Sequence, residues 1–247
     1  MKLRKIAIRL TPARLRPLLT RLRDRVFDIY AMKYYSQEGE DIVLKRIFAE
    51  KEHGFYVDVG AHHPRRFSNT YLFYCRGWKG INIEPNPDCT EAFKLERKRD
   101  INLQLGISDY AGTLTYYVFN DPALNSFDPD LTAARVASTP FRVVGKKEIE
   151  VERLEVILKK YLPIGQKIDF LTIDVEGLDM KVLHSNDWSV FRPRYVLVEL
   201  LETSLENAMQ GEIYSFMKAC SYELYAKTYN TLIFRENDCH VGYRVGR

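Results

Sequence analysis

Five short apolar runs, each nearly continuous in hydrophobic residues, constrain the fold of this chain more than any other feature. They cover residues 55–60, 80–85, 101–108, 168–177 and 194–201. Strands that are buried on both faces have this composition, whereas strands with one solvent-exposed face alternate apolar and polar residues. Segments with helical spacing separate the runs. This order predicts an α/β fold in which helices cover both faces of a mostly parallel sheet.

The segments around these runs supply the helices and a closing hairpin. Hydrophobic residues at helical spacing predict helices over residues 41–50, 68–76, 89–99, 150–162 (at least in its second half) and 211–220. The last two segments, 221–230 and 231–236, are predicted to pair as an antiparallel hairpin at the edge of the sheet. The chain is therefore expected to end with a reversal of strand direction.

The middle of the chain departs from this regular order. Residues 113–120, "TLTYYVFN", are strongly β-prone. Residues 121–147 show weak periodicity and are predicted to be a loop that becomes ordered when a ligand binds. Within that loop, Asn125, Ser126 and Phe127 form either a lid on the acceptor side or an ordinary turn.

The first 33 residues form a separate, strongly basic head. They hold ten Lys and Arg residues against two Asp, a net charge of +8, whereas the whole chain carries +4, so the body is mildly acidic. Apolar residues recur at helical spacing between the arginines, which is typical of a helix that lies on an anionic membrane surface. The alternatives are a solvated helix packed on the domain and an organelle transit peptide. The predicted division is a basic extension, 1–33, and one domain, 34–247.

Composition excludes several classes of protein. No run of 18 apolar residues occurs, so no membrane span is expected, and no apolar stretch follows the basic head as in a signal peptide. The four cysteines form no CxxC pair, which favours a reducing compartment and a cytoplasmic location, with peripheral membrane contact through the head. Since the basic charge is confined to the head, no nucleic-acid partner is expected. The oligomeric state stays open.

Acidic residues stand at the end of every apolar run. The five are Asp58, Glu84, Asp109, Asp174 and Glu199. Ligands of open α/β sheets bind outside the carboxyl ends of the strands, so these acids are expected to face a common site. A buried carboxylate without a partner costs several kcal/mol. The predicted ligand is therefore cationic, rich in hydroxyl groups, or a metal ion.

The spacing of two of these positions narrows the class of ligand. Glu84 lies 24 residues after Gly60, close to the spacing at which an acid meets a ribose diol. The dinucleotide fingerprint is nevertheless missing, because His62 and Arg65 stand where GxGxxG requires glycines. A nucleoside that carries positive charge suits so many carboxylates better than a pyrophosphate does. S-adenosylmethionine is such a molecule.

An ordered set of motifs resembles one family in particular. The stretches are "YSQEGEDIVL" (35–44), "FYVDVGAHHP" (55–64), "FSNTYLF" (67–73), "GWKGINIEPNP" (77–87), "ISDYAGT" (107–113), "LTIDVEG" (171–177) and "VLVEL" (196–200). Together they resemble the FkbM family of S-adenosylmethionine-dependent methyltransferases. The resemblance implies a Rossmann-like class I methyltransferase fold, with a seven-stranded sheet and a reversed last strand. It also implies O-methylation of sugars or related hydroxyls on glycans and natural products.

The resemblance further implies a set of cofactor contacts. Glu84 is expected to take the ribose hydroxyls, and Asp109, with Ser108 beside it, the adenine amine. Asp174 is expected to face the reactive centre. The other residues implied to bind the cofactor are Gln37, Asp41, Asp58, Gly60, Ala61 and His62. One departure is that "GAHHP" replaces the family's "GANxG", which puts His62 in the Asn position near the methionine moiety.

Two chemistries remain open for the acceptor hydroxyl. In the first, His62 or His63 is the general base, with Asp174 and Glu176 completing the catalytic set. The alternative is that His62 bonds the cofactor carboxylate or the loop backbone and His63 is structural. In the second chemistry, Asp174 and Glu199 hold Mg²⁺ or Mn²⁺, which would acidify the hydroxyl. Glu199 is otherwise a partner for an arginine or the backbone.

The sequence thus predicts an O-methyltransferase that uses S-adenosylmethionine and acts on a saccharide hydroxyl. Two alternatives from other classes remain. One is a non-catalytic interaction or trafficking protein on the same scaffold, as some relatives are. The other is a membrane adaptor that works through residues 1–33.

Overall fold

The computed structural model describes residues 12, 15, 17, 31–201 and 203–237. The chain divides into two units, residues 1–34 and 35–247. Most of the first unit, including the predicted basic helix, lies outside the described residues, so that prediction stays untested. The second unit carries the fold that follows. In the described part of the chain, no helix combines the length and the apolar character that crossing a bilayer requires.

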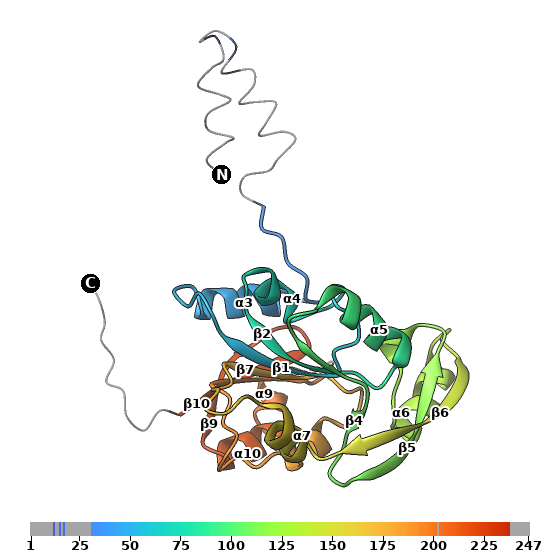
Figure 1. Cartoon of the computed structure of the whole chain (residues 1–247). Coiled ribbons are helices and arrows are strands. Elements are labelled where there is room, and N and C mark those ends of the chain that lie inside the picture. Colours follow the sequence, from blue (N-terminus) through green and yellow to red (C-terminus); the bar gives the residue numbers. More distant parts are fainter. Residues whose placement is uncertain (1–11, 13–14, 16, 18–30, 202, 238–247) are drawn as a thin grey trace. The chain divides into compact units, whose positions relative to one another are not determined.

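A seven-stranded sheet forms the centre of the second unit (Figure 1). Its strands, in spatial order, are β3 (Ile101–Leu103), β2 (Lys79–Ile83), β1 (Phe55–Val59), β7 (Phe170–Ile173), β8 (Tyr195–Glu199), β10 (Thr231–Glu236) and β9 (Tyr222–Lys227). All neighbours are parallel except β10, which runs antiparallel to both β8 and β9. The predicted fold class, including the edge hairpin, is confirmed.

Helices cover both faces of this sheet. One face carries α3 (Glu40–Ile47), α4 (Tyr71–Cys75) and α5 (Pro87–Glu96), and the other carries α7 (Leu154–Tyr161), α8 (Asp179–His184), α9 (Leu205–Ala208) and α10 (Glu212–Ala219). In the central strand β1, Tyr56 packs under α3 and α4, whereas its neighbours Phe55 and Val57 pack in the cluster with α7, α8 and α10. Successive strand residues point to opposite faces, so a sheet covered twice requires an unbroken apolar run.

A smaller sheet corrects the prediction of one strand over residues 101–108. The chain leaves the main sheet after Leu103, and β4 (Gly106–Ile107) begins a three-stranded sheet in the order β4-β6-β5. A Cβ atom on Gly106 would stand 2.8 Å from the Phe127 ring, so only glycine lets the aromatic side chain close over this turn. The sequence does not reveal the change of sheet, because β3 is partly buried and β4 is buried, so both are apolar.

Residues 121–147, predicted to be a loop, are folded, and the β-prone residues 113–120 lie almost entirely in a strand, as predicted. Strand β5 (Gly112–Phe119) and strand β6 (Val143–Glu152) pair antiparallel, and a 3₁₀ turn (Pro122–Leu124) and helix α6 (Pro129–Ser138) lie between them. We call residues 120–142 the cap segment. Asp121 and Asp128 cap the turn and the helix by accepting backbone N–H groups, each directly before a proline at the first position. Strand β6 also replaces the first residues of the helix predicted over 150–162.

Candidate functional site

A cavity of about 390 Å³ lies at the carboxyl ends of β1, β2, β7 and β8, with the cap segment forming another wall. This volume is in the range of small-ligand sites. Seven of the residues predicted from the sequence line it: Gln37, Gly60, His62, Glu84, Asp174, Glu176 and Glu199. The wall also contains Tyr116, which the sequence did not single out, and Asn125 and Phe127, two of the three residues named as a lid or a turn. The predicted location at the strand ends therefore holds for these seven residues.

Glu84 follows strand β2 and is buried, with 5% of its surface exposed. One carboxylate oxygen accepts from the backbone N–H of His62 and the other from that of Asn86, both at 2.8 Å. Burial raises the pKa of Glu84 to about 7, against the lowering effect of these two bonds. Each carboxylate oxygen can accept more than one hydrogen bond, so Glu84 keeps acceptor capacity for a ligand hydroxyl in the cavity.

Gly60 ends strand β1 in the left-handed region, with φ 81. A Cβ atom here would stand 1.7 Å from the backbone carbonyl oxygen of Asp174. The prediction attributed this glycine to close approach of the cofactor. The structure shows a different physical requirement, which is close approach of the neighbouring strand end. Gly60 lines the cavity, and its backbone lies next to that of Ile83, directly before Glu84, and next to that of Asp174.

Asp58 is buried in β1 but does not line the cavity. Its carboxylate accepts from Thr70 Oγ1 at 2.8 Å, and Arg97 Nη2 donates to the same Thr70 oxygen at 3.0 Å. Arg97 also donates to the backbone oxygen of Pro64 at 3.0 Å. Burial raises the pKa of Asp58 to about 6. In this structure Asp58 belongs to a network that holds the loop after β1. It was predicted to contact the cofactor directly, but it is not part of the cavity wall.

His62 lies in the cavity wall at a left-handed backbone position, with φ 51. Its ring stacks on Phe67 with the ring centroids 6.4 Å apart, and its Nε2 atom is buried without a hydrogen-bond partner in the described part of the chain. Burial, followed by the charge of Arg66, lowers the pKa of His62 to about 4. The ring is therefore neutral at pH 7 and offers one nitrogen to a ligand.

His63 points away from the cavity wall and is bound to its own loop. Its Nδ1 accepts from the backbone N–H groups of Arg65 and Arg66, at 3.0 and 3.1 Å. Burial lowers the pKa of this ring. These two bonds give the Nδ1 atom a structural role in the loop, and the assignment of His63 as a general base stays a prediction.

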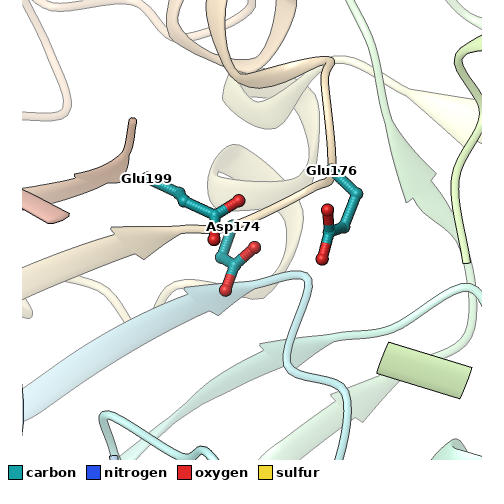
Figure 2. Close-up of side chains that lie close together, drawn as sticks. All are labelled: Asp174, Glu176 and Glu199. Carbon is teal, nitrogen blue, oxygen red and sulfur yellow. The ribbon is translucent and has the colours of Figure 1, made fainter. Parts of the chain in front are cut away.

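Asp174 and Glu199 follow the adjacent parallel strands β7 and β8, and both face the cavity (Figure 2). Each offers a carboxylate oxygen, and these two oxygens lie within 4.8 Å of each other. Burial is the main cause that raises both pKa values, that of Asp174 well above its ordinary range and that of Glu199 to about 8. Two carboxyl groups in contact cannot both ionise cheaply, so the pair retains a proton near neutral pH.

Glu176 is the third carboxylate of the group, but it has a cation of its own. Arg135 of α6 forms an ion pair with Glu176, and it also donates to the backbone oxygen of Leu124 at 3.1 Å. The Ser126 hydroxyl donates to the Glu176 backbone oxygen at 2.7 Å. Glu176 has φ 55, a costly conformation for a residue with a side chain. The cap segment and the loop after β7 are thus joined at the acidic group.

These three carboxylates can also hold a metal ion. Asp174, Glu176 and Glu199 each offer an oxygen, and the three atoms lie within 4.8 Å of one another. Carboxylate oxygens are the ligands that Mg²⁺ and Mn²⁺ prefer. Because Arg135 neutralises Glu176, the two carboxyl groups left for a cation are those of Asp174 and Glu199.

The remaining predicted residues lie in different places. Gln37 reaches the cavity wall, whereas Asp41 does not: its carboxylate accepts from the Tyr35 backbone N–H and the Ser36 hydroxyl, at 2.8 and 2.9 Å. Asp41 therefore shapes the segment that carries Gln37. Ala61 is buried beside the cavity but is not part of its wall.

Ser108 and Asp109 are not among the residues that line the cavity, and their expected place at the adenine stays a prediction. Ser108 is buried, Asp109 is exposed, and the Ser108 hydroxyl lies 3.1 Å from an Asp109 carboxylate oxygen. The cause is the early end of β3. The third strand of the main sheet stops at Leu103, so the residues that meet the cavity are Leu105, Gly106 and Ile107.

Sequence reasoning missed several residues that shape the site. Arg97 and Arg135 reach it from α5 and α6 over large sequence separations, and no local pattern marks them. Phe67 left a stronger signal, since it lies in the "FSNT" motif, yet its conformation, with φ 57 and 42% exposure at the cavity, is visible only in the structure. Asn125 lay in the segment that was predicted to be a loop.

Comparison with known proteins points to one family. The model of the methyltransferase FkbM domain matches residues 58–224. Methyltransferase sdnD of Sordaria araneosa is 30% identical, over 70% of this chain and 80% of that protein.

Two solved structures are similar at a lower level. One is described as an RNA methyltransferase of Pyrococcus horikoshii (TM-score 0.41, 10% identity, 84% of this chain and 91% of that one). The other is a TehB-like methyltransferase of Corynebacterium glutamicum (TM-score 0.39, 8% identity, 92% and 100%). The strand order of the chain itself remains the stronger basis for its fold class.

Proposed function

The chain belongs to the FkbM family of methyltransferases, and on that premise we propose that it methylates a saccharide hydroxyl oxygen. Methyltransferases of this family use S-adenosylmethionine. The family match supports methyl transfer and this cofactor. The oxygen acceptor and its saccharide class are proposed here from the chemistry of the cavity.

The residues of the cavity fit S-adenosylmethionine. Glu84 is buried at the end of the second strand and has acceptor capacity for a ribose diol. The His62 Nε2 atom is buried at the wall without a partner, so it can bond the amino-acid end of the cofactor. The carboxylates of the wall favour a ligand with an ammonium group and a sulfonium. Since a pyrophosphate would be repelled by the same groups, a dinucleotide fits poorly.

The close pair of Asp174 and Glu199 in the cavity wall is the observation that carries the proposal. When bound, the cofactor supplies an electrophilic methyl group and leaves as neutral S-adenosylhomocysteine. A hydroxyl that is methylated must lose its proton, and this pair stands in the cavity wall at the ends of two central strands. Carboxyl groups placed there can accept that proton and orient the oxygen.

His62 fits a binding role better than a catalytic one. Burial makes it a weak base, with a pKa of about 4, and a general base works best when its pKa lies near the operating pH. The neutral ring can instead donate to a carboxylate or accept from an ammonium group through Nε2. We therefore assign the proton transfer to the carboxyl pair.

A hydroxyl-rich acceptor suits the polar part of the wall. Gln37, Glu176 and Asp121 add hydrogen-bonding groups to the carboxyl pair, while the Phe67 ring is 42% exposed at the same cavity. A saccharide combines hydroxyl groups with apolar C–H faces, so it can use both kinds of group. The basic groups Arg66 and Arg135 are each near an acid, Asp121 and Glu176 respectively, which leaves no concentrated positive charge for an anionic acceptor.

Transfer of a labelled methyl group tests the proposal. The protein is incubated with labelled S-adenosylmethionine and a panel of mono- and oligosaccharides, and the products are treated with mild alkali. Methyl ethers survive that treatment and methyl esters do not, so alkali-stable label on a saccharide supports the proposal. Label that appears only on amines or only as an ester contradicts O-methylation of a hydroxyl.

A divalent cation is the second candidate for the chemistry of the acidic group. Asp174 and Glu199 supply carboxylate oxygens close enough to share Mg²⁺ or Mn²⁺. Dialysis against a chelator decides between the two routes. Loss of turnover that Mg²⁺ or Mn²⁺ restores would assign a metal, and an unchanged rate would leave the carboxyl pair as the proton acceptor.

The non-catalytic alternatives have tests of their own. A scaffold that only binds partners needs no cofactor, so calorimetric binding of S-adenosylmethionine opposes that role and supports an enzyme. We keep the cytoplasm as the proposed location, in line with the free thiols of Cys75, Cys89 and Cys220. Deletion of residues 1–33 should abolish binding to anionic vesicles if the head contacts membranes, while turnover of a soluble acceptor is kept.

A further inference from the structure

One amide group of the cavity wall has no hydrogen-bond partner. Asn125 of the cap segment is 6% exposed and lines the cavity. Its Oδ1 atom accepts from the backbone N–H of Phe119 at 2.8 Å, and its Nδ2 atom is buried without a partner among the described residues. The two ends of the amide are not interchangeable, because only the oxygen can accept from an N–H donor. The nitrogen is therefore the end that remains for a ligand.

The backbone around Asn125 holds this donor in place. Ser126 pairs with Tyr117 as a β-bridge, and its hydroxyl donates to the backbone oxygen of Glu176. Asn125 cannot turn its nitrogen toward solvent without breaking the bond to Phe119. A buried donor that lacks an acceptor costs roughly 1–3 kcal/mol, so a ligand atom that accepts from it gains affinity.

Asn125 and Glu84, the residue proposed for the ribose, line the same cavity. Tyr116 lies near both of them. Burial is the main cause that raises the pKa of its hydroxyl, Glu84 raises it further and the Asn125 side chain lowers it, while the Asn125 Nδ2 atom has no partner that meets hydrogen-bond geometry among the described residues. Two residues further on, the Phe127 ring packs at Gly106. The wall here is apolar, with Pro85, Leu105 and Ile107 completing it.

We propose that Asn125 recognises the adenine of the cofactor by donating a hydrogen bond from Nδ2 to a ring nitrogen. The inference rests on the proposed function, since it uses Glu84 as the ribose site. A base attached to that ribose must lie within a few ångströms of Glu84, next to the apolar wall. The ribose hydroxyls require acceptors, which Glu84 supplies, whereas the ring nitrogens of adenine require a donor.

Calorimetric titration of the full-length protein with S-adenosylhomocysteine and its 1-deaza, 3-deaza and 7-deaza analogues tests this. Each analogue replaces one ring nitrogen by C–H. We expect one analogue to bind the native protein about tenfold more weakly than the parent compound. Asn125→Asp should remove the roughly tenfold advantage of the parent compound over that analogue. Any general effect of the new charge acts on all four compounds alike, so the comparison cancels it.

The matched control is Asn120→Asp. Asn120 is an exposed asparagine of the same segment, and its Oδ1 also accepts from a backbone N–H, that of Arg142, at 2.9 Å. This variant should bind all four compounds as the native protein does. Equal losses for the Asn125 variant with every compound, or no loss at all, would overturn the role of Asn125. Failure of the native protein to bind S-adenosylhomocysteine would instead overturn the proposed function.

Discussion

The backbone carbonyl oxygen of Asp174 stands 1.7 Å from the place that a Cβ atom of residue 60 would take. Gly60 and Asp174 directly follow the neighbouring strands β1 and β7, and both line the cavity. Gly60 also has φ 81, which a residue with a side chain adopts at a cost. This contact explains why residue 60 is a glycine. The family resemblance alone attributes that glycine to binding of the cofactor.

Gly60→Ala should therefore destabilise the protein even without ligand. We expect a loss of about 3 kcal/mol or more in the free energy of unfolding, because the clash is with backbone and the φ value is unfavourable. Denaturation with urea measures it. Gly145→Ala is the matched control, since a Cβ atom there meets nothing within 4 Å. Equal stability of the two variants would contradict this account of Gly60.

Glu84→Ala should weaken the binding of S-adenosylhomocysteine by at least tenfold. The side chain would no longer offer acceptors to the ribose, and charge-assisted bonds contribute about 1.5–3 kcal/mol. Calorimetric titration gives the affinity. Glu148→Ala serves as control, because Glu148 is an exposed acid of β6 bonded to Thr115 and lies away from the cavity. An affinity that Glu84→Ala leaves unchanged would refute the ribose site.

Asp174→Asn and Glu199→Gln should separate chemistry from binding. Each variant removes an acceptor for the hydroxyl proton but keeps the shape of the side chain. We expect kcat to fall about a hundredfold or more, as for other losses of a general base, while the affinity for S-adenosylhomocysteine changes by less than about fivefold. Single-turnover rates alongside titrations provide both numbers. Full activity of both variants would remove the carboxyl pair from the mechanism.

Stability should fall as pH rises from 6.5 to 8. Burial raises the pKa of Glu84 to about 7 and that of Glu199 to about 8, above their ordinary value of 4.5. The folded state therefore binds more protons than the unfolded state in this window, and its stability decreases with increasing pH. Glu199 interacts with Asp174, Glu176, Asp179 and Arg135. The slope of stability against pH therefore measures these side chains together and not Glu199 alone.

Thermal unfolding of the unliganded protein measures this dependence. His62 has a pKa lowered to about 4, so it contributes the opposite slope, which fades as pH rises above the ordinary histidine value of 6.5. The double variant Glu84→Gln and Glu199→Gln should flatten the slope. A Tm that climbs with pH over this range would show that these carboxyl groups are ionised in the folded protein.

Arg97→Met should be among the most destabilising single changes at this end of the sheet. The guanidinium is fully buried and donates to Pro64, Tyr56, Thr70 and Asp100. Removing it leaves the Asp100 carboxylate buried without its cation, a change that costs about 3–5 kcal/mol. Urea denaturation checks this, and Arg99→Met, at an exposed site two residues along the chain, should change stability by under about 1 kcal/mol. Similar effects of both variants would contradict the structural role of the network.

The residue pattern alone was enough for the fold class and for one edge of the site. A strand buried on both faces must be apolar along its length, so the runs that contain Val57, Ile81, Leu171 and Val198 are visible without any structure. The residue that follows such a strand stands at the carboxyl edge of the sheet. For that reason Glu84, Asp174 and Glu199 could be placed at one edge from their positions in the chain.

Tertiary structure decided which of these residues face the ligand. Asp109 is not among the residues that line the cavity, because the third strand of the main sheet ends at Leu103 and the chain then enters the smaller sheet. Arg135 and Asn125 reach the cavity only because the cap segment folds over it. Such contacts join residues that are far apart in the sequence, and local patterns carry no record of them. Whether an acid binds a ligand or holds a loop, as Asp58 does, depends on those distant partners.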